Sequence, residues 1–147
     1  MCGGMAINNM KKWHKINFAR ITDERGCLSV VEGGKDIDFN IARVYFLYDL
    51  TEDAVRAAHA HRELHQVYLA MSGSFDVHLT DGQVSETVRL DKPDCGLVIR
   101  PGVWREIDNF SPGAVCFVLA SEVYREEDYI RDYDDFVKYA AEQLVGG

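Results

Sequence analysis

The chain has 147 residues, of which 47% are hydrophobic and 27% are charged, and its formal net charge at pH 7 is -8. This length fits one domain with its own core, and the apolar content excludes a disordered chain. The excess of negative charge argues against nucleic acid or an anionic membrane as the main partner. We therefore predict a single globular domain that binds neither.

The cysteines and the start of the chain indicate the compartment. Four widely separated cysteines are present: Cys2, Cys27, Cys95 and Cys116. Because they form no CxxC pair, the pattern is typical of free thiols in a reducing compartment and argues against a zinc site. No apolar run is typical of a signal peptide or a membrane span. We predict a cytoplasmic protein with an N-terminal leader over residues 1–15 and one domain over residues 16–147.

Short apolar-polar alternations separated by turn signals run through most of the chain. We expect strands over residues 16–21, 27–31, 43–50, 66–71, 75–79, 84–90, 96–100 and 114–120. The dipeptide Asp81-Gly82 predicts a tight hairpin, because glycine tolerates positive φ. Strands and turns recurring at this spacing predict an all-β sandwich or barrel.

Only the last segment changes its period. Over residues 126–145, apolar side chains recur at spacings of three and four: Tyr129, Tyr133, Phe136, Ala140 and Leu144. This pattern predicts a C-terminal α-helix, with its tyrosines used for packing.

Residues 56–66 contain three of the five histidines. In an extended chain, residues i and i+2 point to the same face, so His59 and His61 lie side by side and Ala60 points the other way. Two adjacent imidazoles suit either a metal site or proton transfer near neutral pH. A third interpretation is that they only pack in the core.

The order of strands and motifs resembles the cupin superfamily, a jelly-roll β-barrel whose mouth holds a ligand. The first cupin motif pairs HxH with a carboxylate, but Gln66 occupies that position here. The second motif normally supplies a third histidine after its PxG turn, and none follows Pro101-Gly102. Two histidines and a neutral amide make a poor divalent site, so we predict that no metal is bound.

Proton transfer next to a ketone needs a base that titrates near the working pH, and histidine fits. It also needs a donor aimed at the oxygen where the enolate charge develops. Arg56 lies three residues before His59, and Tyr45 and Tyr48 come from the preceding predicted strand. We therefore predict that one of the two imidazoles, His59 or His61, takes the proton and the other returns it, with Arg56 and these tyrosines as candidate donors.

A longer set of motifs resembles the dTDP-4-oxo-6-deoxyglucose 3,4-ketoisomerases over about residues 16 to 139. The matching positions are Arg25-Gly26, Arg43-Val44-Tyr45, Arg56-x-x-His59-Ala60-His61, Gln66, Gly73-Ser74, Asp81-Gly82, Gly96-Leu97, Trp104-x-Glu106, Phe110-Ser111, Val118-Leu119-Ala120-Ser121 and the run Asp128-Tyr129-Ile130-Arg131-x-Tyr133-Asp134-x-Phe136. The last run makes the resemblance much more specific than HxH alone.

This resemblance implies a metal-free, cofactor-free cupin that moves a keto group from C4 to C3 of a dTDP-linked 4-keto-6-deoxy sugar. It implies that His59 and His61 are the catalytic pair, with Tyr45 and Arg56 in the active site. It also points to a homodimer and to a product used by an aminotransferase that makes a 3-amino sugar for an O-antigen or S-layer glycan. One departure is visible: family members often carry glycine after the arginine, where this chain has Ala57.

Further residues are candidates for substrate binding. Trp104 suits stacking on a base or sugar and equally suits a core plug. An acidic protein needs a local basic patch to hold a diphosphate, which makes Arg62, Arg100 and Arg105 candidates, although each alone is also typical of a solvated surface. Gln66, on the strand after the histidines, completes the predicted binding set.

Three other functions remain open at this point. A sugar-nucleotide 3,5-epimerase would use similar groups but change configuration rather than carbonyl position. A non-catalytic sugar-binding cupin would bind without proton exchange. A metal-dependent cupin oxygenase would require a bound metal.

Overall fold

The computed structural model describes residues 11–146 of the chain. Most of the predicted leader, with Cys2, lies outside the described residues. The strands are β1 (Trp13–Asn17), β2 (Arg20–Asp23), β3 (Gly26–Ser29), β4 (Arg43–Leu47), β5 (Arg56–His61), β6 (Gln66–Ser72), β7 (Phe75–Thr80), β8 (Ser85–Leu90), β9 (Cys95–Ile99), β10 (Trp104–Asp108), β11 (Val115–Ala120) and β12 (Tyr129–Ile130). The helices are the 3₁₀ turn η2 (Glu126–Asp128) and α1 (Tyr133–Gly146).

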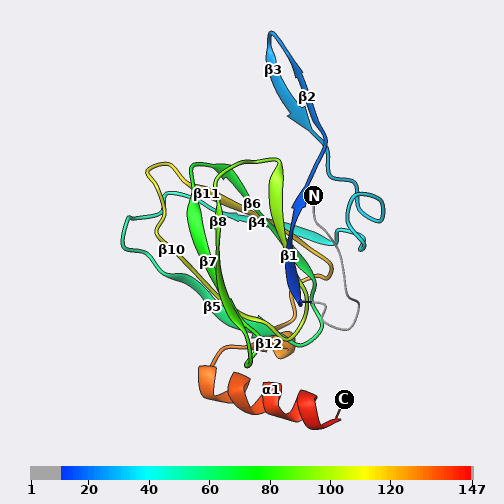
Figure 1. Ribbon diagram of the computed structural model, residues 1–147, viewed down its shortest axis with the longest axis vertical. Helices are drawn as coiled ribbons and strands as arrows, with labels where there is room; N and C mark the ends of the chain where they lie inside the picture. The colour runs from blue at the N-terminus through cyan, green and yellow to red at the C-terminus, as the bar shows by residue number, and fades with distance from the viewer. Residues whose placement is uncertain (1–10, 147) are drawn as a thin grey trace.

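Two five-stranded sheets form the body of the molecule. The first has the order β1-β9-β6-β11-β4 and the second has the order β12-β5-β10-β7-β8. All their strand pairs are antiparallel. The sheets face each other as a jelly roll, with α1 at one end of the molecule (Figure 1). The predicted all-β cupin architecture with a C-terminal helix is confirmed, although the two sheets do not join into one closed barrel.

The main core lies between the sheets and follows from strand alternation. In β7, for example, Phe75, Val77 and Leu79 are buried while the residues between them are partly exposed. A smaller cluster lies on the outer face of the second sheet, where Ala60, Trp104, Ile130 and Phe136 pack together. Burying such side chains stabilises the fold by roughly 1.5–3 kcal/mol each.

Two strands differ from the prediction. β1 begins at Trp13, inside the predicted leader, because the Trp13 ring is buried in the main core and its N–H donates to Glu86 at 2.8 Å. β10 was not predicted at all. It carries Arg105 and Glu106 in a row, and this pair of charges hides the apolar alternation that otherwise signals a strand.

The C-terminal helix is shorter than predicted. Its predicted first turns are instead η2 and β12, and α1 begins only at Tyr133. The Asp132 carboxylate accepts a hydrogen bond from the Asp135 N–H at 3.0 Å, which is typical of a helix N-cap. Tyr129 and Ile130 pair with β5, so their backbone groups are used by the sheet.

Two hairpins are present, of which the first was predicted. Asp81-Gly82 connects β7 and β8, and Gly82 takes φ 97°, which suits glycine. β2 and β3 form a two-stranded arm that projects from the body at the end opposite α1 (Figure 1). Within residues 11–146, no helix has the length and apolar character needed to cross a membrane.

Candidate active site

A β-bulge in β5 shapes the start of the histidine strand. Arg105 pairs with His59 and Glu106 with Ala57, so Ala58 is the extra residue. Ala57 and Ala58 both have positive φ, 74° and 53°. The left-handed region costs an L-residue roughly 1–2 kcal/mol, and such strain clusters at functional sites. The position where ketoisomerases often carry glycine is therefore one where the backbone favours glycine.

His59 and His61 lie on the same face of β5, as predicted from their spacing. Their ring centroids are 4.8 Å apart in an edge-to-face arrangement, while Ala60 packs on the opposite face. His59 Nδ1 donates to the Ala57 carbonyl oxygen at 3.1 Å. His61 Nδ1 lies 2.9 Å from Oδ2 of Asp128. Each ring is thus held through Nδ1.

The other nitrogen of each ring is left free. Nε2 of His59 and Nε2 of His61 are buried and have no hydrogen-bond partner within residues 11–146. Burial first, and then the charge of Arg105, lowers the pKa of each imidazole to about 2. Both rings are therefore neutral at pH 7. Because a carbonyl oxygen and a carboxylate only accept, each Nδ1 carries the proton and each Nε2 presents a lone pair.

A buried arginine lies behind the histidines. The Arg105 side chain is fully buried and donates to Oε1 of Gln66 at 2.5 Å and to the Val103 carbonyl oxygen. The Gln66 amide in turn donates to the Tyr45 hydroxyl at 3.1 Å. Burial raises the pKa of Tyr45, so its phenol stays protonated. Among residues 11–146, no carboxylate lies within 4.0 Å of the Arg105 guanidinium, so its positive charge is felt by the histidines.

The segment after β11 forms one wall of the site. The Tyr129 ring packs against His59 and His61, with centroids at 5.1 Å and 4.4 Å. The Arg131 guanidinium stacks on Tyr129 at 4.1 Å and is held by two hydrogen bonds to Glu126. Sequence reasoning assigned this segment to helix packing. Only two residues, Tyr129 and Ile130, pair with β5, and so short a strand leaves no periodic signal in the sequence.

These residues surround a cavity of about 340 Å³. It is lined by Arg43, Tyr45, Leu47, Arg56, Ala57, His59, Tyr68, Ile107, Val118, Tyr129 and Arg131. The volume is within the range of small-ligand sites. Three arginines, Arg43, Arg56 and Arg131, give the lining a positive charge that contrasts with the acidic chain as a whole.

Comparisons with known proteins agree with this geometry. The FdtA family model, described as WxcM-like, C-terminal, matches residues 11–141. A TDP-4-oxo-6-deoxy-alpha-D-glucose-3,4-oxoisomerase from Aneurinibacillus thermoaerophilus is 46% identical over 126 residues, covering 86% of this chain and 91% of that protein. The chain belongs to the FdtA family of sugar 3,4-ketoisomerases.

Solved ketoisomerase structures share the fold along nearly the whole chain. QdtA from Thermoanaerobacterium thermosaccharolyticum, in complex with TDP, is 40% identical with a TM-score of 0.88, over 90% of this chain and 96% of that one. A 3,4-ketoisomerase from Helicobacter canadensis is 43% identical with a TM-score of 0.87, over 90% of this chain and 99% of that one. The family predicted from the sequence motifs is therefore confirmed.

Two arginines predicted to bind the ketoisomerase substrate lie away from the cavity. The Arg62 guanidinium stacks on Tyr139 of α1 at 5.3 Å, because it follows the end of β5 on the helix side. Arg100 follows β9 and lies 3.5 Å from the Asp38 carboxylate. Of the three predicted arginines, only Arg105 is near the histidines, since it pairs with His59 across β10 and β5, and it is not among the residues that line the cavity.

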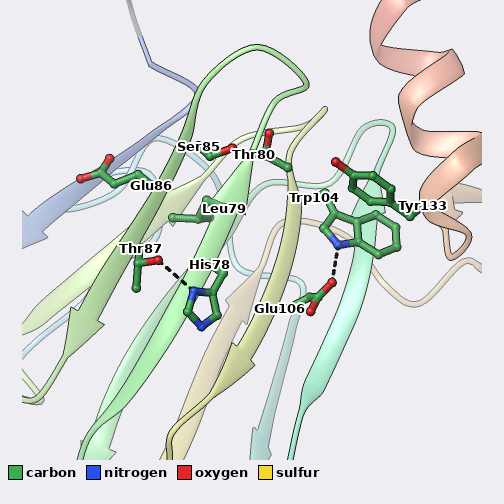
Figure 2. Close-up of a pocket in the computed structure, with 9 residues that line it drawn as sticks. All are labelled: His78, Leu79, Thr80, Ser85, Glu86, Thr87, Trp104, Glu106 and Tyr133. Carbon is green, nitrogen blue, oxygen red and sulfur yellow. Dashed lines mark hydrogen bonds between the residues drawn. The ribbon is translucent and has the colours of Figure 1, made fainter.

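Trp104 also lies outside the ketoisomerase site. Adjacent residues of β10 point to opposite faces, so Arg105 points inward and Trp104 points outward. The Trp104 ring is buried against Phe136 of α1 and donates to Glu106 at 3.0 Å. Figure 2 shows it beside Tyr133, at the edge of a second cavity on the outer face of β7, β8 and β10. Trp104 therefore packs in the buried cluster on the outer face of the second sheet.

Around the second cavity, polar side chains form hydrogen bonds with one another. His78 bonds to Thr87 at 2.8 Å, and Trp104 bonds to Glu106 (Figure 2). His78 Nε2 also lies 2.6 Å from Asp108. Among the described residues, the buried imidazole nitrogens without a hydrogen-bond partner are those of His59 and His61, which makes the first cavity the candidate active site.

The donor set at the histidines does not fit a divalent cation. In the cupin carboxylate position, both ends of the Gln66 amide are occupied, by Arg105 and Tyr45. A cation there would also meet the buried Arg105 charge. Within residues 11–146, no group of three His, Cys, Asp or Glu side chains is arranged to hold a metal ion.

Proposed function

We propose that this protein is a sugar-nucleotide 3,4-ketoisomerase that converts dTDP-4-oxo-6-deoxyglucose to its 3-oxo isomer. One observation carries the proposal. Two neutral imidazoles lie side by side, each with a free Nε2 lone pair among the described residues, and one of them, His59, lines a cavity with three arginines. Proton abstraction next to a carbonyl needs such bases, and a diphosphate needs such cations.

We infer that the substrate diphosphate binds Arg43, Arg56 and Arg131, in place of the arginines predicted from the sequence. Nε of Arg43 is buried and finds no hydrogen-bond partner in the described part of the chain, and the Arg131 guanidinium is already oriented by Glu126 and Tyr129. A preorganised guanidinium forms two parallel bonds to a phosphate with little further ordering. The sugar ring then lies toward His59, which lines the cavity.

The reaction moves one proton between carbons and one between oxygens. His59 Nε2 takes the C3 proton, the C3–H electron pair forms the C3=C4 bond, and the C4 carbonyl pair moves to O4. The O3 proton then passes to O4. The O3 electron pair forms the new C3 carbonyl, and the C3=C4 pair takes up a proton at C4. His61 is the partner that takes this proton over from His59 Nε2 and returns it to C4.

Arg105 supports this chemistry by electrostatics. Its fully buried charge lies behind the histidines and has no carboxylate within 4.0 Å among the described residues. A fixed positive charge in a site of low dielectric constant stabilises negative charge that develops on O4 in the enediolate. Burial, together with the same charge, lowers the pKa of both histidines and keeps them neutral at pH 7.

The deciding experiment is incubation with dTDP-4-oxo-6-deoxyglucose followed by NMR of the product. We expect the carbonyl at C3 and, in D₂O, deuterium at C4 wherever the relayed proton exchanges with solvent before it is returned. A carbonyl that stays at C4 with inverted C3 or C5 would indicate a 3,5-epimerase instead. An unchanged sugar without proton exchange would indicate a non-catalytic sugar-binding protein.

We further propose that the reaction needs no metal. The support is the Gln66 amide, whose two ends are both hydrogen-bonded, beside the buried Arg105 charge. Turnover after exhaustive dialysis against EDTA should equal that of untreated protein. A stoichiometric transition metal whose removal abolishes turnover would contradict this proposal.

We also propose that the protein is a homodimer formed through the β2–β3 arm and the β4 edge. The arm exposes Ile21 and Leu28, and β4 exposes Phe46 next to Tyr48. A two-stranded arm is marginally stable alone, and an apolar sheet edge needs cover. Light scattering should give twice the chain mass, and Ile21→Asp with Leu28→Asp should give monomers. A wild-type monomer at micromolar concentration would contradict the proposal.

The product's place in metabolism follows from its chemistry. A ketone at C3 is the group that an aminotransferase converts to an amine, so we propose that this product leads to a 3-amino sugar for an O-antigen or S-layer glycan. Adding a glutamate-dependent sugar aminotransferase should convert the product and leave the 4-oxo substrate unused.

The free thiols of Cys27, Cys95 and Cys116 fit a cytoplasmic enzyme, and cell fractionation would test that location.

A further inference from the structure

The structure assigns a role in this reaction to Asp128, which we propose is a positioning residue that acts through His61. The inference rests on the proposed ketoisomerase function. Asp128 is far from the histidines in the chain and belongs to η2, the turn before β12. The pairing of β12 with β5 brings its carboxylate to His61, since Tyr129 pairs with His61 itself.

Both oxygens of the Asp128 carboxylate have assigned partners. Oδ2 accepts from His61 Nδ1 at 2.9 Å, and Oδ1 accepts from the backbone N–H of Glu63 at 2.7 Å. The Asp128 carbonyl oxygen also accepts from the N–H of Arg62 at 3.0 Å. The His61 side chain is fully buried and that of Asp128 is 5% exposed. The backbone N–H groups of Arg62 and Glu63, which follow β5, thus hold Asp128 and its carboxylate in place.

This contact determines which nitrogen of His61 is protonated. An ionised carboxylate only accepts, so Nδ1 carries the proton and Nε2 keeps its lone pair. Among the described residues, the buried Nε2 of His61 has no hydrogen-bond partner, so its lone pair is available to accept a proton. His61 therefore begins each turnover as a proton acceptor and can deliver a proton only after it has received one.

The two histidines differ in what faces Nδ1. His59 donates to the neutral carbonyl of Ala57, whereas His61 donates to a carboxylate. When the proton leaves His59 Nε2, its N–H electron pair stays on that nitrogen and a new N–H bond forms at His61 Nε2. The positive charge on His61 then faces the Asp128 carboxylate. A charge-assisted hydrogen bond of this kind stabilises the imidazolium.

Asp128→Asn is a sharp test because the change is isosteric. The N–H of Glu63 can only donate, so the amide oxygen of the variant must face Glu63. The amide NH₂ then faces His61 and forces its Nδ1 to accept, which moves the ring proton to Nε2. We expect kcat to fall about a hundredfold or more, with the Kd for dTDP unchanged. Nitrogen-15 NMR of His61 should show Nδ1 protonated in the wild type and Nε2 protonated in the variant.

The chain offers a matched control in its other histidine–carboxylate pair. Asp108 lies 2.6 Å from His78 Nε2, and His78 lines the second cavity on the outer face of the second sheet (Figure 2). Asp108→Asn makes the same chemical change away from the active site. We expect its kcat to stay within about twofold of the wild type, because general acid–base effects require contact with the reacting groups.

A second comparison tests whether Asp128 acts through His61. In the His61→Asn background, Asp128→Asn should cause no further loss of kcat, because residues that act as a unit are not additive. A kcat for Asp128→Asn within about threefold of the wild type would overturn the proposal. So would an independent, multiplicative loss in the double variant.

Even if Asp128→Asn does not fold, the NMR measurement on the wild-type protein tests the proposed protonation of His61. A wild-type His61 protonated at Nε2 would overturn the proposal, and one protonated at Nδ1 would support it. Failure of the ketoisomerase assignment is distinguishable, because then the wild type itself does not convert dTDP-4-oxo-6-deoxyglucose.

Discussion

Lowering the pH from 7 to 5.5 should destabilise the protein through its two buried histidines. The pKa of His59 and that of His61 are lowered to about 2 in the folded protein, chiefly by burial and the Arg105 charge. In the unfolded chain both return to their ordinary value of 6.5. Between these values only the unfolded chain takes up the protons. Stability is therefore present above pH 6.5 and is lost as the pH falls below it.

The magnitude follows from proton linkage. Going from pH 7 to pH 5.5, each unfolded imidazole with a pKa near 6.5 gains about 0.7 proton, and the folded one gains almost none. Integrating this difference gives about 1.2 kcal/mol for each histidine and about 2.5 kcal/mol for the pair. That is a large share of the roughly 5–15 kcal/mol that stabilises a typical domain.

Urea unfolding at pH 7 and pH 5.5 measures the effect directly. The control is the His59→Asn, His61→Asn double variant, which keeps every other titrating group, including His14 and His65. We expect the wild type to lose about 2.5 kcal/mol more than the variant between the two pH values. If the losses differ by less than about 0.5 kcal/mol, the histidines titrate normally in the folded protein and the electrostatic reasoning is wrong.

Three further predictions concern single residues. His59→Asn should lower kcat at least about a hundredfold while dTDP still binds, and His65→Asn, outside the pair, should remain near wild type in steady-state kinetics. If His59→Asn keeps near-full turnover, another base does the chemistry. Arg131→Gln should weaken dTDP binding about tenfold or more by calorimetry, whereas Arg100→Gln should not, and equal effects would contradict the phosphate assignment. Ala57→Gly should raise the free energy of unfolding by about 0.5–1 kcal/mol, because φ at this residue is 74°; a loss of stability would show that the bulge is not strained.

Local features of the site could be predicted from the sequence. The spacing of His59 and His61 alone places both rings on one face of a strand, and the structure has them 4.8 Å apart. The Asp81-Gly82 hairpin also depends on neighbouring residues only. Such features follow from backbone geometry within a few residues, so one sequence is enough to predict them.

The choice among the arginines could not be made in this way. Arg62, Arg100 and Arg105 were equal candidates for the diphosphate, but the cavity is lined by Arg43 and Arg131, together with Arg56, which was predicted in the active site. Whether an arginine reaches a cavity depends on which face of its strand is turned inward and on what packs nearby. Arg105 is inside and its neighbour Trp104 is outside because β10 lies between β5 and β7 with that register.

Sequence by itself determined the strand-rich fold, the histidine pair and the missing metal ligands, because residue type and short-range alternation encode them. Tertiary structure alone decided that Asp128 reaches His61 across 67 positions of the chain and that Tyr129 packs on both rings. A stretch such as Asp128 to Arg131 suits either a helix start or a strand by its own preferences. The exposed edge of β5 offers it backbone partners, and that long-range pairing outweighs the weak local preference.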